Sequence, residues 1–267
     1  MFSFITCLRH PTTVQSMPMM LALLERTLST IEAQTNQDFT ITVVCHEIPE
    51  LSHTYPHVEF LIVDIPPPAQ DFAHIVADLE LVRLDKGRKY LAGLYHVRPR
   101  HPSHVMFFDA DDCLSPHIVE TVLSGPRNQS WYVGEGYIYA EDSRWIVYRK
   151  NDFHTHCGTC YIFDERFYAD LPADMGEISE EWMKNNLGSH RLVHTYLAER
   201  GIVLQKIPYP AVVYIINTGE NHSGLTGYAR WASRRPGIIR WVRFILKIFA
   251  FRPLSDKVRK EFQLMEV

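Results

Sequence analysis

The fold is decided by one stretch, His104-Val105-Met106-Phe107-Phe108-Asp109-Ala110-Asp111-Asp112. Its consecutive apolar residues predict a buried strand, and three carboxylates follow where that strand would end in a loop. Carboxylates this close repel one another, which raises their pKa values unless a cation lies among them. Oxygen ligands of this kind suit Mg²⁺ or Mn²⁺, which usually keep several waters and share their coordination with substrate phosphates. The stretch therefore predicts a strand-end cation site.

The same residues also fit a purely structural turn. In that interpretation Asp112 or Ser115 is the N-cap of the next helix, and Pro116 lies in its first turn. The rest of the sequence has to decide between a site and a turn.

Length and composition indicate one large α/β domain or a domain with an appendage. The 267 residues are 46% hydrophobic and 22% charged, which is ordinary for a globular protein with a substantial core. A net charge of -4 gives no reason to expect a nucleic acid as partner. Five cysteines without regular spacing favour reduced thiols in the cytoplasm over a disulfide framework. We expect neither a secretory signal nor a membrane-spanning helix, because no apolar run has the required length and flanks.

Strand and helix patterns alternate through the first half of the chain. The expected strands are 2–8, 39–45, 58–63 and 105–108, and the expected helices are 19–34 and 85–95. This alternation is typical of a parallel sheet with crossover helices, in which ligands bind outside the carboxyl ends of the strands. Polar residues gather at these predicted ends: Thr6, Arg9, His46, Glu47, Asp109 and Asp111. Their agreement in position favours a functional site.

The second half of the chain is less regular. The patterns predict antiparallel strands at 130–133 and 145–148, joined by a turn around 141–143, then a strand at 157–163 and a short helix near 165–168. A helix is expected at 187–200, ended by Gly201 as its C′ residue, with extended segments at 202–204 and 211–216.

Several segments together carry a family resemblance. They are the strand 2–8, the helix segment 28–34, the strand 40–45, the run 85–93, Phe107 to Asp112, and the segments 158–163 and 188–201. In this order and spacing the chain resembles a glycosyltransferase of the GT-A fold, most similar to family 2, whose DxD signature corresponds to the acidic stretch. The resemblance implies a Rossmann-like mixed sheet flanked by helices, with a GT-A domain at 1–228 and a basic, aromatic helical tail at 229–267.

What the resemblance implies is a metal-dependent transferase that moves a sugar from a nucleotide-diphosphate-sugar donor, UDP-sugar favoured, to a glycan, lipid-linked or other cell-envelope acceptor. Asp111 and Asp112 would bind Mn²⁺ or Mg²⁺, and Asp111 would be catalytic through that cation, which neutralises the leaving diphosphate. Asp109 would share contacts with the ribose and the metal. The residues implied around the donor are Thr6, Arg9, His46, Glu47, Asp85, Lys86, Arg88 and Asp109.

The general base is less clear than the donor site. Where many inverting members of the family have an aspartate, this chain has Ser189-His190. Histidine accepts a proton near neutral pH, so His190 is the candidate base. A residue that only orients the acceptor, or a structural histidine, fits the position equally well, and Glu180 or Glu181 are alternative carboxylates. The stereochemical outcome stays open.

Two further segments carry candidate contacts. Residues 217–224 form an expected loop after the last strand, and GT-A enzymes often close such a loop over the donor. By that resemblance His222 would be a further metal ligand, and Asn221 and Ser223 would bind the phosphates. His156 is a candidate acceptor contact beside the expected strand 157–163, an interpretation we favour over a zinc or redox site built on Cys157 and Cys160.

Residues 234–251 combine a basic stripe with apolar and aromatic positions. This pattern fits an interfacial helix on an anionic membrane surface, and it equally fits a terminal helix packed on the domain or on a second subunit. The expected localisation is cytoplasmic, with 234–251 as a candidate contact with the inner face of the membrane.

Two other functions fit parts of the sequence. A phosphatase of the haloacid dehalogenase type also uses a strand-terminal Asp-x-Asp, but expects Thr or Val two positions after the second aspartate, where this chain has Cys113. A catalytically silent binding or scaffold protein with the GT-A fold is favoured by the missing aspartate before His190. The intact acidic triplet argues against that alternative.

Overall fold

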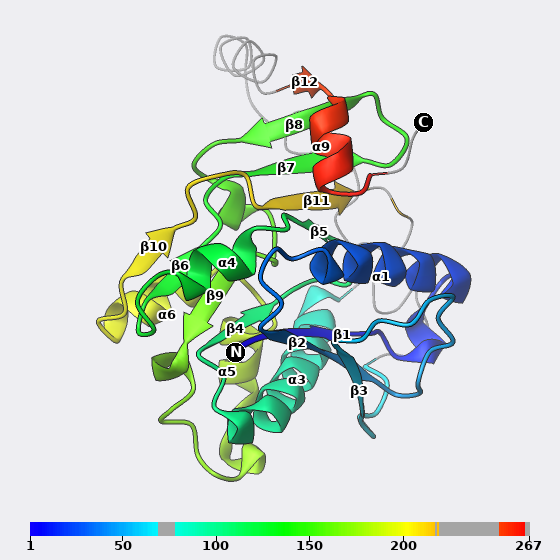
Figure 1. Ribbon diagram of the computed structural model, residues 1–267. Helices are drawn as coiled ribbons and strands as arrows, with labels where there is room; N and C mark the ends of the chain where they lie inside the picture. Colours follow the sequence, from blue (N-terminus) through cyan, green and yellow to red (C-terminus); the bar gives the residue numbers. More distant parts are fainter. Residues whose placement is uncertain (69–77, 217, 219–250, 265–267) are drawn as a thin grey trace, which may run out of the picture.

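Two β-sheets with helices packed against them make up the protein, a computed structural model that describes residues 1–68, 78–216, 218 and 251–264 (Figure 1). The larger sheet has seven strands in the order β10-β6-β9-β4-β1-β2-β3, and the smaller has five in the order β12-β8-β7-β11-β5. The expected class, a mixed α/β fold with a parallel-rich sheet flanked by helices, is confirmed.

The strands of the larger sheet are β1 (Phe2–Cys7), β2 (Phe39–Cys45), β3 (Val58–Ile62), β4 (His104–Phe107), β6 (Ser130–Tyr132), β9 (Tyr161–Asp164) and β10 (Leu204–Lys206). Strands β3, β2, β1 and β4 are parallel neighbours, whereas β9 is antiparallel to both β4 and β6. The central strands β1, β2 and β4 are mostly apolar and are buried almost throughout, because helices cover both faces of a parallel sheet. Their carboxyl ends therefore point to one edge, as the sequence predicted.

Helices α1 (Met17–Glu32) and α3 (Leu79–Val97) lie on opposite faces of the parallel strands (Figure 1). Ser16 caps α1 by accepting a hydrogen bond from the backbone N–H of Met19, and Asp78 caps α3 in the same way at Glu80. Because α3 begins at Leu79 and not at residue 85, Lys86 and its neighbours lie inside the helix and not near its start.

The remaining helices are short: α4 (Ile118–Leu123), α5 (Glu180–Asn186), α6 (Val193–Glu199) and α9 (Asp256–Glu261), with 3-10 turns η1 (Pro11–Thr13), η2 (Arg98–Arg100), η3 (Phe153–Thr155), η4 (Glu165–Phe167) and η5 (Met175–Glu177). The expected helix at 187–200 is wrong in its first part, since α6 begins only at Val193. Gly201 has a φ of 68° and follows the C-cap Arg200, which confirms it as the C′ residue.

The acidic stretch does form a turn, with the Asp112 N–H donating to the Asp109 carbonyl at 3.2 Å, but the expected helix cap is wrong. After the carboxylates the chain forms the short strand β5 (Cys113–Leu114), and α4 begins after His117, which makes no side-chain capping hydrogen bond. Neither Asp112 nor Ser115 caps that helix. The carboxylates therefore have no role as a helix cap.

The second sheet contains the main error of the sequence prediction. Strand β8 (Trp145–Arg149) pairs with β7 (Gly136–Ala140), and not with the expected partner at 130–133, which forms β6 in the other sheet. Strand β7 is hard to recognise in the sequence because it begins with Gly136, a residue that is rare in strands. A Cβ at this position would lie 2.6 Å from the Phe153 ring, so only glycine fits. Strands β11 (Val212–Ile216) and β12 (Phe251–Pro253) complete the sheet.

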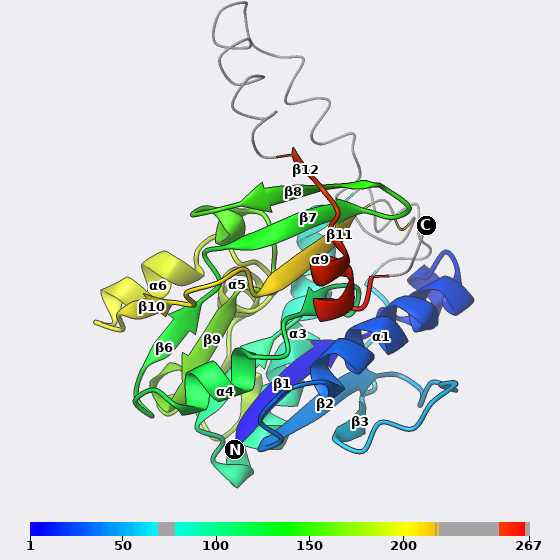
Figure 2. The same cartoon turned by 45° about the horizontal axis from the view of Figure 1, so that its top comes forward.

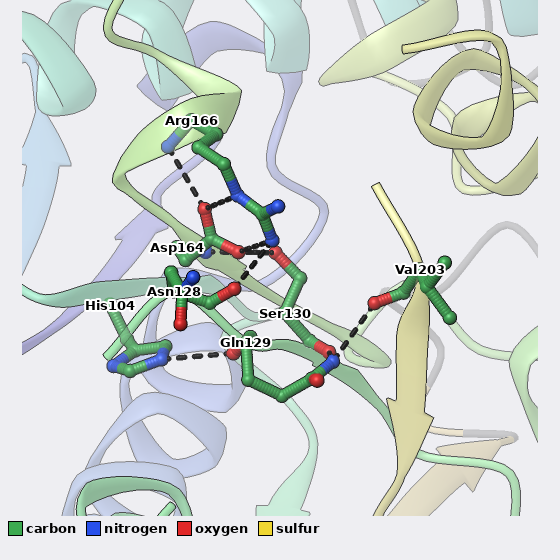
Figure 3. A network of polar contacts seen from close by, with 7 residues as sticks. All are labelled: His104, Asn128, Gln129, Ser130, Asp164, Arg166 and Val203. Atoms are coloured by element: carbon green, nitrogen blue, oxygen red, sulfur yellow. Dashed lines mark hydrogen bonds and ion pairs between the residues drawn. The ribbon is translucent and has the colours of Figure 1, made fainter. Parts of the chain in front are cut away.

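Strand β9 is shorter than expected, because residues 157–160 are not part of a strand. The predicted strand 157–163 is therefore wrong at its beginning. The antiparallel half of the larger sheet is fixed by a buried polar network (Figure 3). In it Asp164 accepts hydrogen bonds from Ser130 Oγ (2.8 Å) and Arg166, and His104 Nε2 donates to the Gln129 carbonyl (3.0 Å).

Part of the expected C-terminal tail packs on the second sheet. Leu254, Phe262 and Leu264 are buried with residues of β7 and β11, so α9 covers this sheet (Figure 2). Most of the expected interfacial segment 234–251 lies outside the described residues. Among the described helices, none is both long enough and apolar enough to cross a membrane.

Two glycines allow α5 and the residues after it to approach α3. A Cβ on Gly87 would lie 2.6 Å from the Met183 carbonyl oxygen, and a Cβ on Gly188 would lie 1.9 Å from the Arg83 carbonyl oxygen. Both neighbours are backbone atoms, which cannot move aside as a flexible side chain can. This close approach fixes the chain before His190 against the helix that carries Lys86.

We predict that Gly188→Ala lowers the free energy of unfolding by about 1–3 kcal/mol, because the added methyl group pushes α3 and α5 apart. Urea unfolding measures the effect. In the control variant Gly176→Ala the added Cβ meets only the Asp174 carboxylate, 3.2 Å away and exposed, so stability should stay within about 0.5 kcal/mol of the wild type. Equal stability of the two variants would contradict the packing argument.

Candidate functional site

The acidic loop, residues Asp109 to Asp112, follows β4 at the edge where the parallel strands end. The preceding Phe108 is held from three sides. Its carbonyl oxygen accepts hydrogen bonds from Thr6 Oγ1 and from the Tyr90 hydroxyl, both at 2.7 Å, and its N–H donates to the Ile5 carbonyl at 3.0 Å. The loop therefore starts from a fixed point between β1, β4 and α3.

Asp109 forms an ion pair with Lys86, whose ammonium donates to Oδ1 of the carboxylate. The Tyr90 hydroxyl lies 3.4 Å from the same oxygen. Burial alone would raise the pKa of Asp109, but the Lys86 ammonium outweighs it and holds the pKa below its ordinary value. Asp109 is therefore ionised and compensated by a cation of the chain itself.

The negative charge of Asp111 is less well compensated by nearby cations than that of Asp109. Burial and the neighbouring charge of Asp109 raise its pKa to about 6, against the smaller opposing effects of Arg9 and Lys86. A divalent cation beside Asp111 would relieve this repulsion and stabilise the ionised form. The carboxylate is partly exposed, so a ligand can reach it.

Asp112 is fully buried and contacts groups of the protein. Its Oδ2 accepts hydrogen bonds from Thr159 Oγ1 (2.5 Å) and Cys157 Sγ (3.2 Å), and its Oδ1 lies 3.4 Å from the backbone N–H of Ile215. Burial, followed by the charges of Asp111 and Asp109, raises its pKa well above the ordinary value. In this conformation Asp112 connects the acidic loop to residues 157–159 and to β11, and its predicted role as a metal ligand stays a prediction.

Thr159 orients two members of the loop at once. Its hydroxyl accepts a hydrogen bond from the backbone N–H of Asp109 (2.9 Å) and donates one to Asp112. Gly158 lies beside it, where an added Cβ would be 2.7 Å from Asp109 Oδ2 and 3.2 Å from Lys86 Nζ. Neither Gly158 nor Thr159 can be assigned to the acidic loop from the sequence, because both reach it only through the tertiary fold.

A cavity of about 320 Å³ opens at the ends of β1 and β2. Three residues predicted to contact the donor line it: Arg9, His46 and Glu47. Leu8, Pro11, Met17, Met20 and Leu21 contribute much of its apolar wall. Its size lies at the lower end of the range for small-molecule sites.

His46 lines this cavity and keeps one ring nitrogen as a hydrogen-bond acceptor. Its Nε2 lies 3.0 Å from the Ile65 carbonyl and must donate to it, which leaves Nδ1 as an acceptor. Among the described residues Nδ1 has no hydrogen-bond partner and is buried. Burial, and then the charge of Lys89, lower the pKa of His46, so the ring is neutral at pH 7. Because Nδ1 is buried, an N–H group of a ligand could reach it only after a neighbouring side chain or the ring itself moves.

Three other predicted donor residues make contacts within the protein. Thr6 is fully buried with its hydroxyl on Phe108, as described above. Asp85 pairs with the fully buried Lys89 at 2.7 Å, while its Oδ1 is buried without a hydrogen-bond partner in the described part of the chain. Arg88 pairs with Glu180 on α5. Of the predicted residues on α3, the structure thus brings Lys86 into direct contact with the acidic loop.

His190 lies in the connection before α6, where Lys86, Gly158 and His190 line one small cavity of about 20 Å³. Its Nε2 donates to the Thr155 carbonyl at 3.3 Å, so Nδ1 is the acceptor. Burial lowers the pKa of His190 to about 4, against the raising effects of the Thr155 contact and of Asp109. At pH 7 the ring is neutral, and it is a weak base in the free protein.

The described structure does not place His156 in contact with the acidic loop. His156 lies 2.8 Å from an Arg149 guanidinium nitrogen and 3.7 Å from Asp152, beyond the end of β8. Asn221, His222 and Ser223 lie outside the described residues. Their roles stay predictions.

The side chains of the acidic loop supply part of what a divalent cation needs as ligands. In the described ranges no group of three or more His, Cys, Asp and Glu side chains is arranged to hold a metal ion. Magnesium usually takes one or two carboxylates and completes its shell with waters and substrate phosphates. Asp111, with Asp109 beside it, supplies that smaller set.

Comparison with known proteins gives structural similarity only. No protein-family model and no curated protein matches the sequence. The crystal structure of TarS from S. aureus aligns with a TM-score of 0.42 and 8% identity, over 80% of this chain and 36% of that chain. A "putative nucleotide-diphospho-sugar transferase" from Desulfovibrio desulfuricans G20 aligns with a TM-score of 0.35 and 10% identity, over 80% of both chains. This chain thus spans about a third of the TarS chain, and the function has to be argued from the site.

We predict that Thr159→Val lowers the free energy of unfolding by about 1–3 kcal/mol, because it leaves the Asp109 N–H without its acceptor and removes a donor from buried Asp112. Urea unfolding measures the change. Thr155→Val, which removes an exposed hydroxyl, should stay within about 0.5 kcal/mol of the wild type. A Thr159→Val variant as stable as this control would contradict the proposed role of the hydroxyl.

The raised pKa of Asp111 predicts a pH-dependent effect of Asp111→Asn. Between about pH 4 and pH 6 the folded wild type keeps a proton on Asp111 that the unfolded chain has lost, so its stability contribution falls as the pH rises. The amide variant lacks this loss. Its stability relative to the wild type should therefore increase from pH 4 to pH 7, measured by urea unfolding with a chelator present. A constant difference would contradict the raised pKa of Asp111.

Proposed function

We propose that the protein is a glycosyltransferase that uses a nucleotide-diphosphate-sugar, with a UDP-sugar as the first candidate, and Mn²⁺ or Mg²⁺. One observation carries the proposal: the Asp109–Asp111 pair lies at the same sheet edge as the cavity lined by Arg9 and His46. In open α/β sheets this edge is where ligands bind. The cavity beside His46 suits the nucleobase of such a donor, and the acidic pair with its nearby cations suits the diphosphate.

The base and the diphosphate would have separate partners. His46 Nδ1 would accept a hydrogen bond from an N–H of the base, such as the imide of uracil. Arg9 and Lys86, which already act electrostatically on Asp111, would face the phosphate oxygens. Asp111, with Asp109, would hold the divalent cation, and when bound this cation supplies Lewis-acid stabilisation of the departing nucleoside diphosphate.

His190 would act on the acceptor side. The neutral ring presents Nδ1 as a hydrogen-bond acceptor, so it can orient an acceptor hydroxyl near the sugar. A proton on His190 is disfavoured in the free protein, and the negative charge of a bound donor would favour it. The acceptor class proposed is a glycan or a lipid-linked molecule. The basic and aromatic composition of 234–251 agrees with a lipid-linked acceptor at the inner face of the membrane.

A donor-hydrolysis screen tests the proposal. UDP-, GDP- and dTDP-sugars are incubated with the protein and Mn²⁺ or Mg²⁺, and release of the nucleoside diphosphate is measured. We expect release from one donor class that depends on the metal. Asp111→Asn should lower kcat/KM by about 10²–10³-fold, the effect of losing one electrostatic contact to a developing charge.

Glu199→Gln is the matched control, because it removes one exposed carboxylate from α6 and should leave kcat/KM unchanged. Nucleotide binding without release from any donor would favour a silent binding protein. Release that persists undiminished in Asp111→Asn would contradict the proposed metal site.

A further inference from the structure

The acidic loop already contains a cation, the ammonium group of Lys86. It donates a hydrogen bond to Asp109 Oδ1 and lies 5.3 Å from the centre of the Tyr90 ring. Among the described residues, Asp109 is its hydrogen-bond acceptor, so the other ammonium hydrogens have no acceptor within the protein there. The side chain is partly exposed, which leaves room for another anion to approach.

The local structure is shaped around this ion pair. Gly158 faces both partners, and a Cβ at that position would be 2.7 Å from Asp109 Oδ2 and 3.2 Å from Lys86 Nζ. The backbone of α3 beside Lys86 is fixed by Gly87, which packs against the Met183 carbonyl. Any larger residue at 158 would press on the carboxylate. The pair is therefore accommodated by the fold and is not a chance surface contact.

No neighbouring cation of α3 can take this role. Lys89 is fully buried and is held by Asp85 (2.7 Å) and the Leu8 carbonyl (3.1 Å). Arg88 is paired with Glu180 on α5. Of these three basic residues, Lys86 alone contacts the acidic loop within the described structure.

An ammonium group and a divalent cation compete for the same carboxylate. Both are attracted to Asp109, and at adjacent positions they repel each other. A diphosphate changes this balance, because its oxygens accept the ammonium hydrogens and offer the cation further ligands.

We propose that Lys86 is a built-in counter-ion that holds Asp109 in the free protein and transfers to the diphosphate when the donor binds, which frees Asp109 for the divalent cation. This inference rests on the proposed function. It makes metal binding weak without a nucleotide and couples the two ligands, so each raises the affinity for the other by the same factor.

Mn²⁺ binding tests the coupling without any measurement of activity. Free Mn²⁺ is titrated by electron paramagnetic resonance with and without UDP, in the wild type, Lys86→Met and the control Lys184→Met, which removes a lysine of α5 that pairs with Glu80. In the wild type and in Lys184→Met, UDP should tighten Mn²⁺ binding by a factor in the usual range of about 5–150-fold. In Lys86→Met, Mn²⁺ alone should bind about 10-fold more tightly than to the wild type, and UDP should add little. Lys86→Gln replaces Lys86→Met if that variant does not fold.

The outcomes separate this inference from the proposed function. Unchanged or weaker binding of Mn²⁺ alone to Lys86→Met, with the wild-type effect of UDP retained, would overturn the counter-ion role and leave the transferase proposal standing. A wild type that binds neither Mn²⁺ nor UDP would overturn both.

Discussion

Repulsion among the three carboxylates of the acidic loop is the constraint on which the site depends. Asp109, Asp111 and Asp112 lie within four residues, in surroundings that raise the cost of each negative charge. The chain compensates the first with Lys86 and satisfies the last with Thr159 and Cys157. Asp111 and Asp112 both keep raised pKa values, but only Asp111 of these two is partly exposed, so it is the one that an added cation can reach. The chemistry proposed for the site follows from this unequal compensation.

The compensating groups come from distant parts of the chain. Lys86 belongs to α3, Thr159 to the segment before β9, and the loop itself to the end of β4. Two close contacts bring them together: Gly188 against the Arg83 carbonyl, and Gly158 against Asp109. The small volume of these two glycines is therefore needed for the ion pair, since larger side chains would move Lys86 and Asp109 apart.

The parallel half of the larger sheet could be predicted from the sequence because its signals are local. Buried parallel strands are rich in apolar residues, and β1, β2 and β4 have that character despite a few polar positions such as Ser3, Thr6 and Thr42. The strand-end position of Asp109 and Asp111 follows from the same runs. The contact between Lys86 and the acidic loop was only partly predictable, since the family resemblance placed this lysine near the donor but gave no sign of its pairing with Asp109.

Where the prediction failed, a tertiary contact overrides a local pattern. Strand β7 begins with Gly136 because the Phe153 ring occupies the space of a side chain, and this weakens the strand signal. Residues 157–160 have strand-like composition, but they turn so that Cys157 and Thr159 reach Asp112. The late start of α6 places His190 outside a helix, which periodicity alone does not reveal.

The central claim is that the acidic loop holds a divalent cation together with a nucleoside diphosphate. The most direct measurement is a crystal structure of the protein with UDP and Mn²⁺, using anomalous diffraction at the manganese edge. The account predicts one anomalous peak coordinated by Asp111 and the diphosphate, with the uracil beside His46 and the Lys86 ammonium on a phosphate oxygen. A peak away from Asp111, or UDP bound outside the cavity at the ends of β1 and β2, would contradict it.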